Sequence, residues 1–390
     1  MLINIKNKDV LKLIIKEYLN HFRFLSLFKY NKQFQNRLNI SIKDFELLNF
    51  IEIELIPNKP LKNQKNNFIC INSNNLFMRQ KSSSYHIFFN ANKSEIKRDF
   101  ITPDDKIDKI KIVIDKEEKS LRGLFTFCEC LKEINFIQFV RKDIIDMREM
   151  FAFCKSLSKI NFFSFRTNNV IYMNQMFRSC LCLIELDLSN FNLSSLTHMN
   201  DMFSGCCNLK KINLSKIDTS HVINMNNMFN GCSSLEYLDL SELDTSNVVD
   251  MGFMFFNCSS LNEIKFSEKF NTSKVKDMSL MFSGCSKLTK LNIDKFDTSH
   301  VTNMYRMFNA CSELKKLDIE NFNTSNVIDM RFMFNGCKSL IDINIHNFII
   351  NKKCCIHWMF SDTSKELKNK IKEQNLKISN LGIEDYLPDI

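Results

Sequence analysis

The fold is decided by the stretch 225–250, which reads MNNMFNGCSSLEYLDLSELDTSNVVD. Its opening pattern, Met-x-x-Met-Phe, recurs in eight copies, which begin at positions 147, 173, 199, 225, 251, 278, 304 and 330. The spacing is 26 residues, with a single spacing of 27 between Met251 and Met278. Degenerate copies begin at Leu121 and Ile356, so ten copies cover about 121–360. A fixed period of this length is the signature of a repeat protein in which each unit forms one coil.

Each repeat carries two patterns of buried side chains. An alternating pair such as Leu238 and Leu240 has the two-residue period of a strand with one buried face. The Met-x-x-Met-Phe group places apolar residues at i, i+3 and i+4, which predicts a short helix. An Asp or Asn such as Asn224 stands before the first Met, where a helix N-cap is preferred. A turn is predicted at Asp-Thr-Ser, for example 244–246, because these side chains bond to nearby backbone.

We therefore predict an α/β leucine-rich-repeat solenoid with one short strand and one short helix per coil. About ten coils would form a parallel sheet about 45–50 Å long. The expected organisation is an N-terminal helical segment (1–50), a strand-containing linker and N-terminal cap (51–120), the solenoid (121–360), and a C-terminal capping helix and tail (361–390). Within these parts we expect helices at about 7–30, 31–39, 42–50 and 364–375, and strands at 85–90 and 109–115.

Composition and charge exclude several classes of protein. With 44% hydrophobic and 25% charged residues, the 390-residue chain is expected to fold. The net charge of +9 is concentrated in residues 1–120, which hold 22 basic and 14 acidic residues, so the repeats are nearly neutral and no nucleic-acid partner is expected. No run approaches the ~20 apolar residues of a membrane helix, and lysines interrupt Met1–Leu19. We therefore expect no membrane span, no signal peptide and a cytoplasmic location.

The sulfur-containing residues are interpreted as core. Seventeen of the 19 methionines lie in the two Met columns, and nine of the ten copies have a cysteine three residues after the Phe. One thiol per coil cannot surround zinc tetrahedrally, and parallel side chains are poorly placed for disulfides. We predict buried free thiols that react slowly, for example at positions 154, 232, 258 and 285. No catalytic, cofactor or metal motif stands out, so we expect no enzyme, no cofactor and no metal.

The repeats closely resemble those of the BspA-like leucine-rich-repeat surface protein family. The resemblance rests on runs such as 238–251, followed by Met254-Phe255 and by Asn257-Cys258-Ser-Ser-Leu261, and it covers about 60% of the chain. It implies adhesion or protein–protein contact at cell surfaces and no enzymatic activity in the repeat. The chain is expected to differ from bacterial surface members of the family by lacking a signal peptide or lipoprotein cysteine near its start.

Three functions remain open at this point. The first is a non-enzymatic interaction scaffold in the cytoplasm, a monomer with a protein partner. The second is a surface or secreted adhesin, in which the sequons at Asn192, Asn257, Asn271 and Asn323 could be glycosylated. The third is an F-box-like substrate adaptor of a ubiquitin ligase, suggested by the apolar residues of 11–27, although the Pro-containing opening of that family is absent.

The candidate partner-binding residues are the outward positions of the strands, because side chains alternate across a sheet. One column comprises Lys211, Tyr237, Glu263, Lys290 and Lys316, and the other comprises Asn213, Asp239, Lys265, Asn292 and Asp318. These columns vary between coils, whereas the buried columns hardly change. Tyr237 is the one aromatic residue among them and is the predicted anchor. The alternative is that these outward positions only contact solvent and bind no partner.

Overall fold

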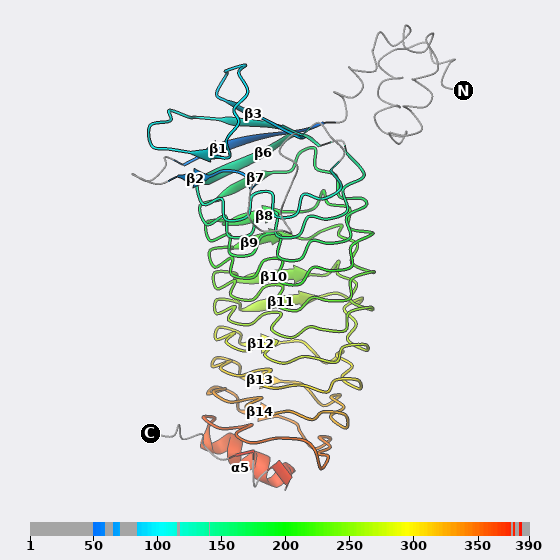
Figure 1. Cartoon of the computed structure of the whole chain (residues 1–390). Coiled ribbons are helices and arrows are strands. Elements are labelled where there is room, and N and C mark those ends of the chain that lie inside the picture. The colour runs from blue at the N-terminus through cyan, green and yellow to red at the C-terminus, as the bar shows by residue number, and fades with distance from the viewer. Residues whose placement is uncertain are drawn as a thin grey trace, which may run out of the picture.

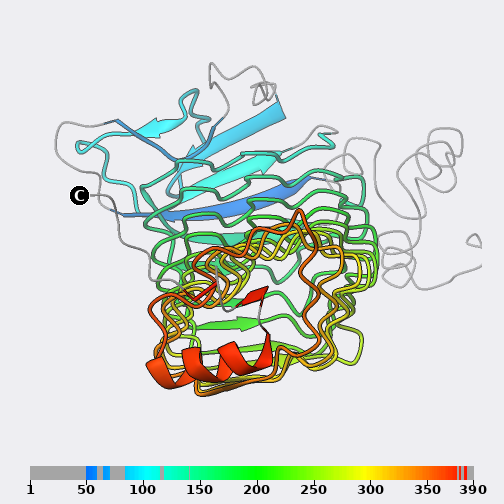
Figure 2. The same ribbon diagram turned by 90° about the horizontal axis from the view of Figure 1, so that it is seen from below.

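The computed structural model describes residues 50–58, 65–70, 84–114, 118–139, 141–375, 377–378 and 382–383. The helices predicted within 1–50 lie outside this range. The described chain forms a β-solenoid of about eight turns whose stacked coils run down the length of the molecule (Figure 1). Seen along its axis, the coils superimpose into one closed outline (Figure 2).

A five-stranded sheet lies at the N-terminal end of the coils, in the order β3-β5-β1-β6-β7. Its strands are β1 (Ile51–Pro57), β3 (Tyr85–Phe89), β5 (Ile110–Ile114), β6 (Leu131–Phe139) and β7 (Lys159–Asn161). β1 pairs antiparallel with β5 and β6, while β6 pairs parallel with β7 and so joins this sheet to the coils. A short ladder of β2 (Asn66–Asn67) and β4 (Phe100–Ile101) lies beside it. The strands predicted at 85–90 and 109–115 are present as β3 and β5.

Each later coil contributes one strand of two to four residues. These strands are β8 (Glu185–Asp187), β9 (Lys211–Asn213), β10 (Tyr237–Leu240), β11 (Glu263–Phe266), β12 (Lys290–Leu291), β13 (Lys316–Leu317) and β14 (Asp342–Ile343). The pairing is parallel, but it is divided into separate ladders, β8-β9, β10-β11 and β12-β13-β14. The expected single continuous sheet is therefore not formed, because such short strands leave gaps in the hydrogen bonding.

The prediction of one helix per coil is wrong. Met-x-x-Met-Phe folds into successive turns, in which the Met228 amide donates to the Met225 carbonyl at 3.2 Å. Alternate amides donate instead to the next coil, as Phe229 N does to Met254 O at 2.9 Å. Asn227 adopts φ 58° and Gly231 φ 73°, which a right-handed helix excludes. The spacing i, i+3, i+4 buries the same side chains in either form, so periodicity alone could not distinguish a helix from turns.

The predicted N-cap residues have a different role in these turns. The Asn224 side-chain oxygen accepts a hydrogen bond from the Asn226 amide at 2.9 Å, and Asp250 accepts one from the Gly252 amide at the same distance. Each is an Asx-turn, in which the side chain bonds to the backbone two residues on. The Asp or Asn before the first Met therefore bonds to the backbone that follows it, as an N-cap would, but it starts a turn instead of a helix.

The Met, Phe, Cys and Leu columns are buried and form one core along the axis. Rings of the Phe column stack from coil to coil, and Phe229 lies 5.4 Å from Phe203 and 5.9 Å from Phe255. The predicted burial of the ladder thiols is confirmed: Cys232 is fully buried and its Sγ donates to the carbonyl of Phe203 in the preceding coil at 3.3 Å. Burial raises the pKa of these thiols, for Cys258 to about 12.

The Asp-Thr-Ser segment joins neighbouring coils. Asp244 accepts a hydrogen bond from the Ser246 amide, which is the predicted local turn. The threonine does more: Thr298 is fully buried, donates to the Asn323 carbonyl at 3.0 Å and accepts from the Asn323 amide at 2.8 Å. One hydroxyl thus satisfies both polar groups of a residue in the next coil.

The C-terminal end is covered by α5 (Lys365–Gln374), close to the predicted 364–375. Ser364 is its N-cap and accepts from the Leu367 amide at 3.1 Å. Leu367 and Ile371 are buried, and in Figure 2 the helix lies along one side of the coil outline at this end. Gln374 hydrogen-bonds to the backbone of Ile343 and Ile345, so it satisfies polar groups that the last strand would otherwise expose.

Candidate functional site

The two predicted columns lie on the outer face of the strands β9 to β13 and the residues that follow them. Strand register aligns Tyr237 with Glu263 and Asp239 with Lys265, while Leu238 between them is buried. Every residue of the first column is exposed, and 45% of the Tyr237 surface is accessible. In the second column Lys265, Asn292 and Asp318 are exposed, whereas Asn213 and Asp239 are partly buried. We call these ten residues the strand face.

Part of the second column supports the backbone, which the sequence analysis missed. Asn213 accepts a hydrogen bond from the Ser215 amide at 3.1 Å, and Asp239 accepts one from the Ser241 amide at 2.8 Å. Asp318 accepts one from the Glu320 amide at 3.3 Å. These contacts turn the chain away from the strand. In the sequence, this role is indicated by an Asp or Asn that recurs two residues before a turn. Because these three side chains hold the backbone, their replacement would disturb the fold, and they are poor choices for binding mutations.

Charged side chains on the strand face pair across coils. Lys265 Nζ lies 3.3 Å from Asp239 Oδ2, and Lys316 Nζ lies 3.2 Å from Asp342 Oδ2. Register also sets Lys290 directly opposite Lys316. Adjacent like charges are unfavourable, and since Lys316 has Asp342, Lys290 presents the less compensated positive charge of the two.

Tyr237 is held in place on this face. Its hydroxyl donates to Asp239 Oδ2 at 3.4 Å, a long hydrogen bond, and Asp239 is in turn bonded to Ser241 and Lys265. Desolvation and the Asp239 carboxylate raise the pKa of Tyr237 above its ordinary value. The arrangement offers an aromatic surface with a polar rim, which suits protein recognition.

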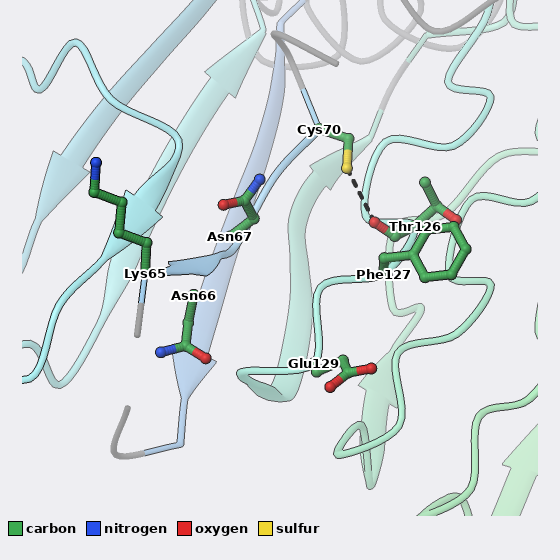
Figure 3. A pocket seen from close by; sticks show the side chains of 7 residues that line it. All are labelled: Lys65, Asn66, Asn67, Cys70, Thr126, Phe127 and Glu129. Atoms are coloured by element: carbon green, nitrogen blue, oxygen red, sulfur yellow. Dashed lines mark hydrogen bonds between the residues drawn. The ribbon is translucent and has the colours of Figure 1, made fainter. Parts of the chain in front are cut away.

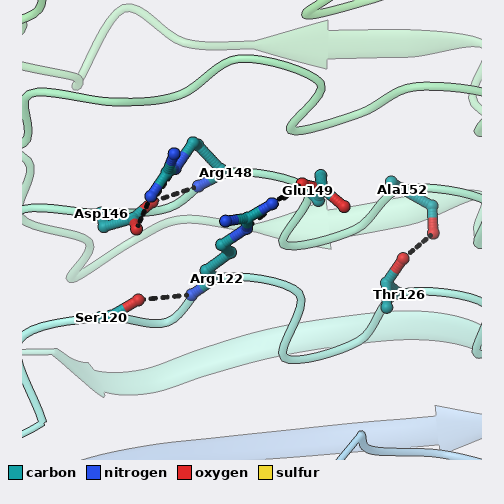
Figure 4. Close-up of polar contacts among 7 residues, drawn as sticks. All are labelled: Ser120, Arg122, Thr126, Asp146, Arg148, Glu149 and Ala152. Carbon is teal, nitrogen blue, oxygen red and sulfur yellow. Dashed lines mark hydrogen bonds and ion pairs between the residues drawn. The ribbon is translucent and has the colours of Figure 1, made fainter. Parts of the chain in front are cut away.

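Further polar contacts lie in the first coils, on the side formed by the Met-x-x-Met-Phe turns, which we call the turn side (Figure 4). Arg122 binds Glu149 of the next coil with Nη2 2.7 Å from Oε1, and Arg148 binds Asp146 at 2.7 Å. Thr126 donates to the carbonyl of Ala152 at 3.2 Å. All these groups have partners within the chain, so the network acts in coil stacking.

A cavity of about 240 Å³ opens beside the first coil (Figure 3). It is lined by Lys65, Asn66, Asn67, Cys70, Thr126, Phe127 and Glu129. Cys70 Sγ points at the Thr126 carbonyl and donates to it at 2.9 Å. Phe127 is 60% exposed and stacks on Phe153 at 4.6 Å. Sequence reasoning missed this site because its two walls are far apart in the chain and only one of them belongs to a repeat.

In the part of the chain that the structure describes, no group of three or more His, Cys, Asp or Glu side chains is placed to hold a metal ion. No described helix has the length and apolar character needed to cross a membrane.

Comparison with known proteins identifies the repeats. The family model described as "Mycoplasma protein of unknown function, DUF285" matches residues 119–213, 183–267, 206–291 and 263–374. The crystal structure of a leucine-rich repeat protein from Bacteroides ovatus ATCC 8483 is similar at 17% identity, over 67% of this chain and 76% of that chain, with a TM-score of 0.35. No curated protein matches the chain. The resemblance to BspA-like repeats is confirmed.

Proposed function

This chain belongs to the family described as Mycoplasma protein of unknown function, DUF285, and on that premise we propose that it is a non-enzymatic protein-interaction scaffold. The strand face is the proposed binding surface, on a solenoid of ten coils, one for each motif copy. We further propose a cytoplasmic monomer that binds another protein and takes no nucleic acid or cofactor. The match to a repeat family supports a scaffold role.

The observation that carries this proposal is the setting of Tyr237. Its backbone is fixed by the buried neighbours Leu238 and Leu240, its hydroxyl is oriented by Asp239, and its ring stays 45% exposed. Ordering such a side chain costs little on binding, and tyrosines buried by a partner are common hot spots. Lys290, two coils further on, adds a positive charge that favours an acidic group on the partner.

An adhesin is the second candidate, favoured by the likeness to surface repeats of the BspA-like type. The sequon residues Asn192, Asn257, Asn271 and Asn323 are all exposed. Fractionation of cells together with a glycosidase mobility shift distinguishes the two locations. The residues that suggested an F-box-like adaptor lie outside the described part of the chain.

The test is capture of the partner by the full-length protein. Tyr237→Ala combined with Lys290→Glu should weaken capture at least tenfold, about 1.4 kcal/mol, and leave the thermal unfolding temperature nearly unchanged. Lys276→Glu is the charge-matched control, because Lys276 is exposed but lies outside the strand face. Undiminished capture by the double variant, with loss on removal of residues 1–49, would place the partner on the N-terminal segment instead.

A further inference from the structure

Beside the first coil lie two thiols that the solenoid frame does not use in its regular way, and one of them, Cys70, lines the cavity. From Cys154 onward, each thiol of the column donates to a Phe carbonyl in the preceding coil, as Cys154 does to Phe125 at 2.9 Å. Cys128 is the first of the column, so no preceding Phe of the motif faces it. The segment 65–70 packs there instead, held by the Cys70 amide, which donates to the Leu124 carbonyl at 2.9 Å.

The two sulfur atoms converge on one carbonyl oxygen. Cys70 Sγ lies 2.9 Å from Thr126 O, and Cys128 Sγ lies 3.7 Å from the same atom. Cys130 anchors the segment independently, because its Sγ donates to the Asn67 carbonyl at 3.1 Å. Cys70 and Cys128 are thus held together by contacts that do not depend on a bond between them.

The environments of the two thiols differ. Cys70 is half-buried and lines the open cavity of Figure 3, whereas Cys128 is completely buried. The adjacent Cys128 thiol lowers the pKa of Cys70 against the opposing effect of desolvation, and burial raises the pKa of Cys128. Cys70 is therefore the thiol that ionises first and is open to a small reagent, and the thiolate is the reactive form.

We propose that Cys70 and Cys128 form a dithiol site that reacts with a hydroperoxide and closes to a disulfide. The Cys70 thiolate attacks one peroxide oxygen, the O–O bond breaks, and Cys70 becomes a sulfenic acid, while the leaving hydroxide takes up the proton that Cys70 released on ionising and becomes water. Cys128 sulfur then attacks the Cys70 sulfur. The S–S bond forms, the S–O bond breaks, and the departing hydroxide takes the Cys128 proton as water. Two thiols lose two electrons, and hydrogen peroxide is reduced to two waters.

The first consequence is a covalent tie between the segment 65–70 and the first coil, across the N-terminal end of the solenoid. The second is selectivity. Cys182 and Cys355 are exposed and would be oxidised first if accessibility alone decided the outcome, which makes Cys182 a matched comparison.

The experiment treats the reduced full-length protein with one equivalent of hydrogen peroxide and maps its peptides without reduction. We expect a Cys70–Cys128 linkage and the loss of two thiols, abolished in Cys70→Ser and retained in Cys182→Ser. In Cys128→Ser, dimedone should label Cys70 as the trapped sulfenic acid. If that variant does not fold, dimedone added to the wild-type protein with peroxide should label Cys70 in competition with disulfide formation. Oxidation of Cys182 before Cys70, or a link from Cys70 to any other cysteine, would overturn the proposal.

Discussion

Phe229 shows at the scale of one residue why the repeat is so regular. Its ring is completely buried between Phe203 and Phe255, and its amide and carbonyl bond along and between coils. Any side chain of another size would leave a void or a clash that neighbouring coils cannot relieve. The column therefore keeps one residue type, while exposed positions such as Tyr237 are free to differ.

Replacing Phe229 by alanine should lower the free energy of unfolding by about 3–5 kcal/mol, because the vacated space is closed on both sides. Phe360→Ala should cost less, since in the described part of the chain Phe360 stacks on Phe334 and has no ring on its other side, and it lies in the last coil, where the array opens most easily. Urea denaturation of the two variants measures the difference. Equal and small losses would show that the ring column is not the core.

At the scale of the element, one coil is held to the next by polar groups as well as by its core. Buried threonines such as Thr298 hydrogen-bond to the backbone of the following coil, and buried thiols hydrogen-bond to the backbone of the preceding one. Such groups are satisfied only while the coils are stacked, and an unsatisfied buried group is costly. The polar contacts therefore favour cooperative unfolding of neighbouring coils.

Thr298→Val should destabilise the protein by about 1–3 kcal/mol, because it leaves the Asn323 amide and carbonyl without their buried partner. Thr302→Val is the control in the same coil: Thr302 is exposed, so water can replace its 3.2 Å bond to the Lys276 carbonyl. The denaturation midpoints of the two variants, compared with that of the wild-type protein, measure the difference. A loss at Thr302 as large as that at Thr298 would mean that burial of the hydroxyl is not the cause.

The sequence predicted those features that recur with the period of the repeat. Burial of Met228, Phe229 and Cys232 followed from their spacing, as did the outward direction of Tyr237. The turn at Asn227 did not, because its left-handed backbone and its bonds to the next coil leave the apolar spacing of a helix unchanged. Nor did the thiol pair beside Thr126, because Cys70 belongs to no repeat and meets Cys128 only through folding.

At the scale of the whole molecule, the proposed binding surface is separate from the parts that close the two ends of the solenoid. The N-terminal sheet and α5 lie at opposite ends of the coils, and the strands share one side of the stack (Figure 1). On that side, Lys211, Tyr237 and Glu263 begin successive strands β9 to β11, where a partner can contact several coils at once. Such an extended surface is the usual binding device of solenoid proteins.

Hydrogen–deuterium exchange of the full-length protein, alone and with its captured partner, tests the strand-face assignment most directly. We predict slower exchange on binding in peptides that span β9 to β12, centred on Tyr237, with little change in the turn segments at Met225–Phe229 or in α5. Protection confined to the turn side, to α5 or to residues 1–49 would contradict the assignment of the strand face as the binding surface.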